Sequence, residues 1–244
     1  IIPGVVEEWR HVEDTFRDLA GNYGYGEIRT PIFEDTDLFL RSVGKETDIV
    51  RKEMYTFEDR GGRSLTLRAE GTAPAVRAYL ENNLWHQDRE RLVKLYYIAP
   101  IFRYDRPRAG RYRQHLQLGL EALGSAAPEV DAEIMALAWN LFAALDLSGV
   151  KLLLNSVGCP RCTPAYVEQL KATMRSSLGD LCEDCQTRFE QNPLRMLDCK
   201  LCRDYMQRAP HHADALCGEC DDHLEAVKTT LQRLGVPFTH DHSV

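Results

Sequence analysis

Cysteine is absent from the chain before Cys159, and no apolar run is long enough to span a membrane. The sequence also shows no charged, apolar and small-residue leader of the kind that directs secretion. Its formal net charge of -7 argues against a protein that coats nucleic acid without specificity, because such binding depends on a broadly positive surface. We therefore expect a soluble cytoplasmic protein that does not enter a membrane.

The eight cysteines of the 244-residue chain are confined to its last part. This length is enough for one large domain and a smaller one, and the abrupt change in cysteine usage suggests where they meet. We predict a core domain over residues 1–150 and a cysteine-rich domain over residues 151–244. The cysteines form four Cys-x-x-Cys pairs, which are Cys159/Cys162, Cys182/Cys185, Cys199/Cys202 and Cys217/Cys220.

Metal binding is the chemistry that these pairs favour. A reducing cytoplasm disfavours structural disulfides, and thiolates at this spacing are typical of zinc sites. The first two pairs are separated by 19 residues and the last two by 14, both close to structural zinc spacings. Four thiolates close a tetrahedral site and leave no open position, so we expect structural zinc ions. The spacing leaves open which pairs share an ion.

Other interpretations of the cysteines are weaker. Eight free buried cysteines would not be expected to fall into identical pairs, and redox pairs would need a βαβ context repeated four times. Histidines could replace a thiolate as zinc ligands, although histidines in a polar helical stretch are more often solvated. The candidates are His211, His212 and His223.

A strand, a basic loop and a second strand are predicted in the middle of the chain. Residues 92–101 are apolar and rich in β-formers, Pro107 and Gly110 break the pattern, and the return strand starts near Gln114. Five arginines on this acidic chain indicate a local anionic partner, because a guanidinium matches phosphate oxygens bidentately. A solvated basic turn is the alternative, but it would need neither this charge density nor the polar strand face that follows. The arginines are Arg103, Arg106, Arg108, Arg111 and Arg113.

The return strand has one polar face. Leucines at alternate positions from 116 to 120 give the period of a half-buried strand, so Gln117 and Glu121 share the opposite face. Gly119 lies between them without a side chain. A ligand could therefore rest against the backbone there and be held from both ends.

Apolar periodicity and turn residues predict the surrounding elements. An amphipathic helix over residues 5–23 ends at Gly24. Thr72 can cap a further helix with Pro74 in its first turn, which places Glu70 beside a helix N-terminus. On this pattern alone, Glu70 would only complement the helix dipole. The other predicted elements are a strand over 28–33, a hairpin of strands over 55–57 and 64–67, a helix over 130–145, a strand over 152–154 and helices near 166–178 and 224–234.

Three segments resemble class II aminoacyl-tRNA synthetases of the histidyl type. Residues 102–121 (FRYDRPRAGRYRQHLQLGLE) resemble motif 2, a strand-loop-strand hairpin that holds ATP in that family. Residues 30–34 (TPIFE) resemble motif 1, and residues 67–72 (LRAEGT) resemble the histidine-binding turn. The resemblance, which extends from Val12 to Lys200, implies an α+β fold: an antiparallel sheet flanked by helices, with a small cysteine-rich insertion domain. It also implies a homodimer formed through the motif 1 region.

The same resemblance implies histidine–tRNA ligase chemistry. The histidine carboxylate would attack the α-phosphorus of ATP to give histidyl-adenylate and pyrophosphate, and the histidyl group would then pass to the histidine tRNA. Arg103 would be the catalytic residue, gripping the α-phosphate while Mg²⁺ bridges phosphate oxygens. The substrate-binding residues implied are Glu70, Thr72, Arg103, Gln117 and Glu121. Those implied for ATP are Arg103, Asp105, Arg111 and Arg113.

Two rival functions share parts of this pattern. A non-catalytic histidine-sensing regulator, like the synthetase paralogue that partners ATP phosphoribosyltransferase, would have the same fold but would lack the insertion domain that begins at Cys159. A zinc-stabilised interaction module would leave Gln117 and Glu121 without a role. Because the sequence stops at Val244, before the family's glycine-rich motif 3, we expect this chain to be inactive alone.

Overall fold

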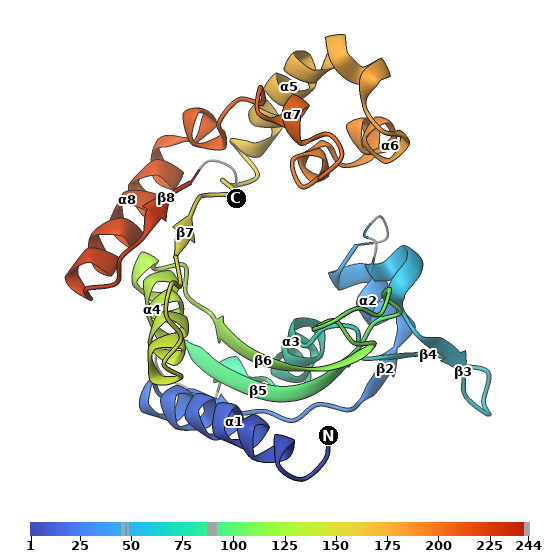
Figure 1. Cartoon of the computed structure of the whole chain (residues 1–244), viewed down its shortest axis with the longest axis vertical. Coiled ribbons are helices and arrows are strands. Elements are labelled where there is room, and N and C mark those ends of the chain that lie inside the picture. The colour runs from blue at the N-terminus through green and yellow to red at the C-terminus, as the bar shows by residue number, and fades with distance from the viewer. Residues whose placement is uncertain (45–46, 48, 87–91, 242–244) are drawn as a thin grey trace. The chain divides into compact units, whose positions relative to one another are not determined.

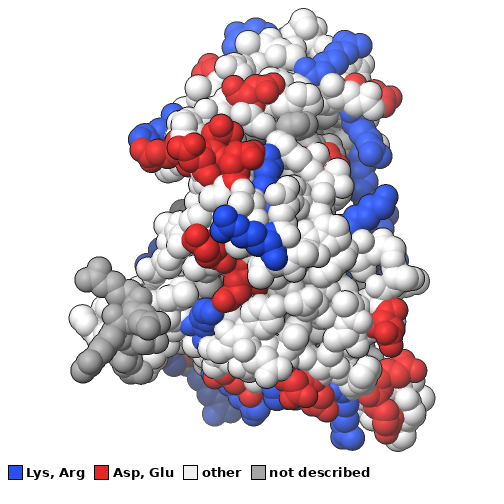
Figure 2. Space-filling view, turned by 90° about the vertical axis from the view of Figure 1, so that its left-hand side faces the viewer, with Lys and Arg blue, Asp and Glu red and all other residues white. Residues whose placement is uncertain are grey.

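The computed structural model describes residues 1–44, 47, 49–86 and 92–241. The chain forms two compact units, the first from residues 1–130 and 140–148 and the second from residues 131–139 and 149–244 (Figure 1). Helix α4 (Pro128–Ala144), which confirms the helix predicted over 130–145, contributes to both units. No helix among the described residues is long and apolar enough to cross a bilayer. On the face drawn in Figure 2, acidic and basic side chains are interspersed.

The central hairpin dominates the first unit, as the sequence predicts. Strands β5 (Val93–Phe102) and β6 (Gln114–Leu123) pair antiparallel along their whole length, in a register that sets Tyr97 opposite Gly119 (Figure 1). The short strand β1 (Gly26–Glu27) pairs parallel with β5. Helix α1 (Val5–Asn22) carries Phe16, whose ring meets Tyr96 edge-on at 5.7 Å between centroids. The predicted first helix is therefore confirmed, and it anchors on β5.

A second sheet of the first unit has the strand order β2-β4-β3. The hairpin of β3 and β4 confirms the predicted one, and the Asp59 carboxylate closes its turn by accepting from the N–H groups of Gly61 and Arg63. The strands and helices around it are β2 (Phe33–Asp35), α2 (Thr36–Ser42), a π-helix (Ile49–Glu53), β3 (Thr56–Glu58), β4 (Ser64–Leu67), α3 (Thr72–Glu81) and a 3-10 helix (Leu84–His86).

The continuous strand predicted over residues 28–33 is wrong. The chain leaves β1 at Glu27, runs irregularly to Ile32 and enters β2 at Phe33, so that the two strands belong to different sheets. Pro31 has no N–H to offer a ladder. The carbonyl oxygens of Thr30 and Pro31 instead accept from the guanidinium of Arg68, at 3.0 and 3.2 Å.

The second unit is mostly short helices. Strands β7 (Leu153–Leu154) and β8 (Thr239–His240) pair parallel, and the predicted helices near 166–178 and 224–234 are confirmed within longer helical segments. The helical segments are α5 (Thr163–Met174), a 3-10 helix (Arg175–Asp180), α6 (Glu183–Gln191), a 3-10 helix (Pro193–Met196), α7 (Arg203–Met206), a 3-10 helix (His212–Ala215) and α8 (Gly218–Arg233).

Two apolar clusters lie inside the second unit. The first, which we call the lobe core, is built from residues between Tyr166 and Ala215 and includes Leu170, Met174 and Phe189. The second, which we call the base core, joins α4 and β7 to α8 through Ala132, Ala136, Leu154, Leu224, Val227, Leu231 and Val236. The two clusters share no member among the described residues.

Candidate functional site

Tyr97 fills the space between the two segments that carry the predicted substrate-binding residues. A Cβ atom added to Gly119 on β6 would lie 2.0 Å from the Tyr97 ring, and one added to Gly71 in the turn before α3 would lie 2.3 Å from it. Only glycine allows such a close approach. The sequence predicts that a ligand could rest against the bare backbone of Gly119. In the structure the Tyr97 ring occupies that place, and the sequence analysis did not foresee it.

The Glu121 carboxylate is half-buried beside this ring. The Tyr97 hydroxyl donates to Glu121 Oε1 at 3.4 Å. Burial raises the pKa of Glu121, and burial together with the neighbouring Glu121 charge raises the pKa of Tyr97 to about 12. The Thr72 hydroxyl lies close enough to both groups to lower their pKa values through hydrogen bonding. Glu121, Tyr97 and Thr72 thus form one polar cluster.

Glu70 caps helix α3. Its carboxylate accepts from the N–H groups of Thr72 at 2.7 Å and Ala73 at 2.8 Å, while Gly71 is the N-cap residue. The prediction that Thr72 caps this helix is therefore wrong, because the glutamate side chain just before the helix reaches forward and accepts from its free N–H groups. Glu70 also lies near enough to raise the pKa of both Tyr97 and Glu121 through its charge. Glu70 therefore complements the dipole of α3 and also lies beside the predicted histidine pocket.

Gln117 lies on β6 two residues before Gly119, on the same strand face as Glu121. Its Oε1 atom is shielded from solvent and has no hydrogen-bond partner among the described residues. A buried acceptor without a donor is costly, so a ligand that donates to it would be stabilised. The site therefore offers one carboxylate and one amide oxygen to a cation-bearing ligand.

Arg103 is held at the end of β5 by the turn that carries Glu70. Its Nε donates to the carbonyl oxygen of Ala69 at 2.8 Å, and its backbone N–H donates to Arg113. Arg68, which precedes Ala69, is only 3% exposed, and its guanidinium donates to the carbonyl oxygens of Pro100, Thr30 and Pro31. Arg68 therefore ties the turn that carries Ala69 and Glu70 to two other segments of the first unit, the one around Pro31 and strand β5.

The arginine loop is partly held together by its own residues. Asp105 forms an ion pair with Arg111, and its carbonyl oxygen accepts from Arg113 Nε at 3.3 Å. The Arg113 guanidinium also lies over the Tyr104 ring, 4.0 Å from its centroid. Burial, and then the charge of Arg103, lowers the pKa of His115 on the first part of β6. Asp105 thus holds Arg111 and Arg113 in place, two of the arginines for which the sequence predicts phosphate binding.

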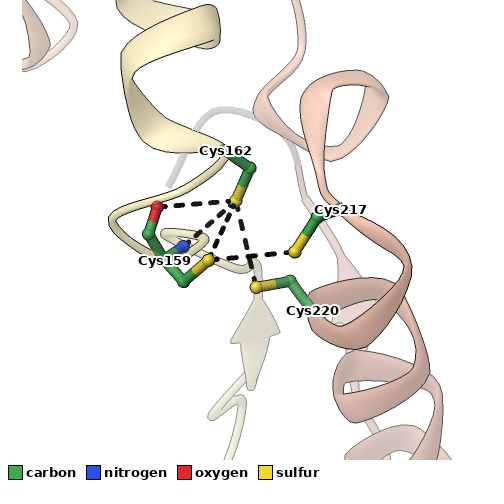
Figure 3. Close-up of side chains that lie close together, drawn as sticks. All are labelled: Cys159, Cys162, Cys217 and Cys220. Atoms are coloured by element: carbon green, nitrogen blue, oxygen red, sulfur yellow. Dashed lines mark hydrogen bonds between the residues drawn. The ribbon is translucent and has the colours of Figure 1, made fainter.

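The eight cysteines gather into two groups of four, a pairing that sequence spacing leaves open. The first and last pairs meet, with Sγ–Sγ distances of 3.8 Å for Cys159–Cys217, 3.7 Å for Cys159–Cys162 and 3.9 Å for Cys162–Cys220 (Figure 3). The two middle pairs form the other group, where Cys182 and Cys199 are 3.7 Å apart. In each group the four sulfur atoms lie within 4.8 Å of one another, so that each could hold a metal ion.

The pKa values of the thiols in the first group shift in both directions: that of Cys220 is raised to about 12, first by its hydrogen bond with Cys217, whereas that of Cys159 is lowered. The N–H groups of Arg161 and Cys162 lower the pKa of Cys159 to about 6. Two of the histidines considered as alternative ligands have other partners and are in neither group of metal-ligand atoms: His212 Nδ1 contacts the Ser156 carbonyl oxygen at 2.6 Å, and His223 pairs with Asp131 at 2.8 Å. His211 is likewise in neither group of metal-ligand atoms.

Sequence reasoning missed two residues of the first unit, Tyr97 and Arg68. Tyr97 could have been found from the strand register, since a residue opposite Gly119 must face the same side, but the loop length alone does not fix that register. Arg68 gives a weaker signal, which is a single charge between Leu67 and Ala69 in an otherwise apolar strand end.

Comparison with known proteins gives consistent matches along the chain. The family model described as histidyl-tRNA synthetase matches residues 1–181. The histidine–tRNA ligase of Pelotomaculum thermopropionicum is 54% identical over 241 residues, covering 98% of this chain and 56% of that protein. The ligase of Desulforamulus reducens is 53% identical over 244 residues, covering 99% and 58%. The chain therefore spans little more than half the length of these curated relatives.

Solved structures agree with this assignment. The apo histidyl-tRNA synthetase of S. aureus superposes with a TM-score of 0.77 at 38% identity, covering 99% of this chain and 55% of that one. A Bacillus halodurans protein described as an ATP phosphoribosyltransferase regulatory subunit/histidyl-tRNA synthetase has a TM-score of 0.62 at 18% identity, covering 96% and 62%, and shows the shared fold alone. From the family match, the two relatives and the strand-loop-strand site together, the chain belongs to the histidyl-tRNA synthetase family.

Proposed function

We propose that the protein of which this chain is a part is a histidine–tRNA ligase, and that the first unit binds histidine and ATP. In the first step the histidine carboxylate attacks the α-phosphorus of ATP, forming histidyl-adenylate and releasing pyrophosphate. The histidyl group then passes to the terminal ribose of the histidine tRNA. No protein nucleophile is required, because the catalytic work is positioning and charge neutralisation.

The proposal is carried by the cluster of Glu121, Gln117 and Thr72 around Tyr97. A half-buried carboxylate and an unpaired amide oxygen on one strand face suit a ligand with several N–H donors, such as the ammonium and imidazole groups of histidine. Glu70 lies close enough to add negative charge near the ammonium. We assign Glu70 and Thr72 to the α-amino group, and Gln117 and Glu121 to the rest of the pocket.

Arg103 is the residue we assign to the α-phosphate. Its anchorage to the Ala69 carbonyl oxygen fixes one edge of the guanidinium and leaves the remaining N–H groups to meet phosphate oxygens. We assign Asp105, Arg111 and Arg113 to the loop over ATP, where Asp105 keeps the arginines in place. Mg²⁺, when bound, would neutralise phosphate charge.

We also propose that each group of four cysteines holds a structural zinc ion. A zinc ion with four thiolates at about 2.3 Å requires sulfur atoms about 3.8 Å apart. The Sγ–Sγ distances of 3.7 to 3.9 Å fit this requirement, whereas a disulfide would need a separation of about 2.05 Å. The sites would be closed to substrate and would support the fold only.

The wider organisation follows from the same family. We propose a catalytic core over residues 1–150, an insertion domain over 151–244, a cytoplasmic location and a homodimer. An exposed apolar group at the motif 1 segment, in which Phe33 and Phe57 meet at 6.4 Å, supports the dimer. Sedimentation of the full-length parent would test it, and a monomer at micromolar concentration would contradict it.

Histidine-dependent ATP–pyrophosphate exchange by the full-length parent protein tests the activity. We expect Arg103→Ala to lower kcat about a hundredfold or more, as for loss of one preorganised charge donor. Arg10→Ala, which removes an exposed arginine of α1, serves as the matched control and should leave exchange unchanged. A folded parent without histidine-dependent exchange would favour the regulatory paralogue instead.

A further inference from the structure

The first group of cysteines lies where the chain crosses between the two apolar clusters of the second unit. From the base core to the lobe core, the chain leaves β7, passes Cys159 and Cys162 and then enters α5. The chain returns from the lobe core to the base core between Ala215, which packs on the lobe core, and Leu216, which packs on the base core. Cys217 and Cys220 follow directly. The four sulfur atoms therefore join the two crossings, which are 58 residues apart in sequence (Figure 3).

The two groups of cysteines differ in what surrounds them. Cys185 and Cys202 are members of the lobe core, and Cys182 and Cys199 pack against it. In contrast, the thiols of the first group belong to neither apolar cluster among the described residues, although Cys162 itself is buried. The second group is therefore part of the interior of the lobe, whereas the first group is not part of either interior.

Polar contacts accompany the first group at the crossing. His212 Nδ1 contacts the Ser156 carbonyl oxygen at 2.6 Å, which links the two passing segments. Gly158 has a φ of +67°, and a Cβ atom there would lie 2.7 Å from Cys162 Sγ and 2.9 Å from His212 Cε1. The glycine thus lets both chain segments close around the sulfur atoms. We define the neck as residues 155–162 and 209–220.

We infer that the site formed by Cys159, Cys162, Cys217 and Cys220 is a metal clasp that fixes the lobe to its base, while the second site is needed for the lobe itself to fold. This inference rests on the zinc sites proposed above. A closed tetrathiolate site at the neck would connect two apolar clusters that have no common member in the described part of the chain. Removal of the clasp metal should therefore release the lobe without unfolding it.

Paired substitutions in the zinc-loaded, full-length parent protein test the clasp. We expect about two zinc ions per chain in the parent, and about one in both Cys159→Ser/Cys217→Ser and Cys182→Ser/Cys199→Ser. Hydrogen exchange of backbone amides then separates the roles. In the first variant, amides of residues 166–206 should stay protected within about threefold of the parent, while neck amides exchange at least about tenfold faster. In the second variant, amides of residues 166–206 should lose protection.

A conservative replacement provides the matched control. Cys217→His keeps a zinc ligand, so it should retain two ions and a protected neck. Loss of protection throughout residues 166–206 in the Cys159→Ser/Cys217→Ser variant, with one zinc ion still bound, would overturn the clasp and leave the zinc sites standing. A parent without bound zinc would overturn the zinc sites and the clasp with them, whatever the ligase activity. The activity proposal is judged separately by pyrophosphate exchange.

Discussion

The two units of the molecule use different means to hold short segments in place. In the first unit, a hairpin of two ten-residue strands forms the sheet, and the buried guanidinium of Arg68 ties the irregular segment around Pro31 to it. In the second, short helices surround two small apolar clusters and eight thiols. Small clusters bury too little apolar surface to be stable alone, so a metal is the common supplement. Hydrogen bonding thus gives precision at the proposed substrate site, whereas the proposed metal sites would give stability away from it.

Metal removal should have the largest effect, and it should affect the two units differently. We expect a strong chelator to unfold the second unit, because the thiolate sites would supply much of its folding free energy. Amides of β5 and β6 in the first unit should stay protected. Hydrogen exchange before and after chelation measures both effects, with a calcium-selective chelator as the control. Undisturbed exchange in the second unit, with zinc removed, would contradict the prediction.

Substitution of Arg68 should be the most damaging single change in the first unit. Arg68→Met removes the donor that three carbonyl oxygens share in part-buried hydrogen bonds and leaves no charge to bridge them, and we expect a loss of about 3 kcal/mol of stability. Arg68→Lys should recover only part of this loss, because a compact ammonium group cannot donate to Pro100 and to the Thr30–Pro31 segment at the same time. Urea unfolding followed through amides of β5 would measure it. A loss no larger than that of Arg10→Met, on the exposed side of α1, would show that the contact is dispensable.

Glu121→Gln should separate substrate binding from stability. Loss of a charged hydrogen-bond acceptor should raise the histidine KM of the full-length parent by about 1.5 to 3 kcal/mol, with the ATP KM almost unchanged. Exchange kinetics measure this. Glu58→Gln, at an exposed position on β3, is the control.

The stability of the same variant has a defined pH dependence. Because burial raises the pKa of Glu121 above its ordinary value of 4.5, the folded state holds the proton more tightly than the unfolded chain. The stability contributed by this group is therefore full below pH 4.5 and is lost as the pH rises through the raised value. Glu121→Gln should consequently melt at a higher temperature than the parent at neutral pH and approach it in acid. A lowered melting temperature at neutral pH, with unchanged histidine KM, would assign Glu121 to the scaffold.

Tyr97→Phe should have the smallest effect. It removes one hydroxyl that donates to Glu121 and keeps the ring between the two glycines, so we expect about 0.5 to 1.5 kcal/mol in histidine KM and little change in ATP KM. Tyr96→Phe is a matched control, because the neighbouring Tyr96 faces the opposite side of β5 and its hydroxyl donates to Glu27 of β1 at 3.4 Å. Equal effects of the two substitutions on histidine KM would contradict a specific role for Tyr97.

Local patterns in the sequence predict the central hairpin and the four cysteine pairs, since alternation, turn residues and Cys-x-x-Cys spacing are properties of neighbouring residues. Contacts between distant segments could not be predicted. The partner of Cys159 is set by how α8 returns to the neck, and the role of Arg68 depends on carbonyl oxygens 32 to 38 residues away. The strand predicted over 28–33 failed for the same reason, because Arg68 takes the acceptors that a ladder would have used.

The packing of Tyr97 between Gly71 and Gly119 also limits how this site can diverge. An alanine at either glycine would place its Cβ within 2.3 Å of the ring, so either substitution would force the buried tyrosine ring or the backbone to move. A smaller residue at position 97 would remove that conflict but would leave a cavity beside Glu121. Changes at these three positions should therefore be epistatic, because a replacement that is harmful alone becomes acceptable only after a second one. Substitutions fixed one at a time should rarely convert one functional combination into another.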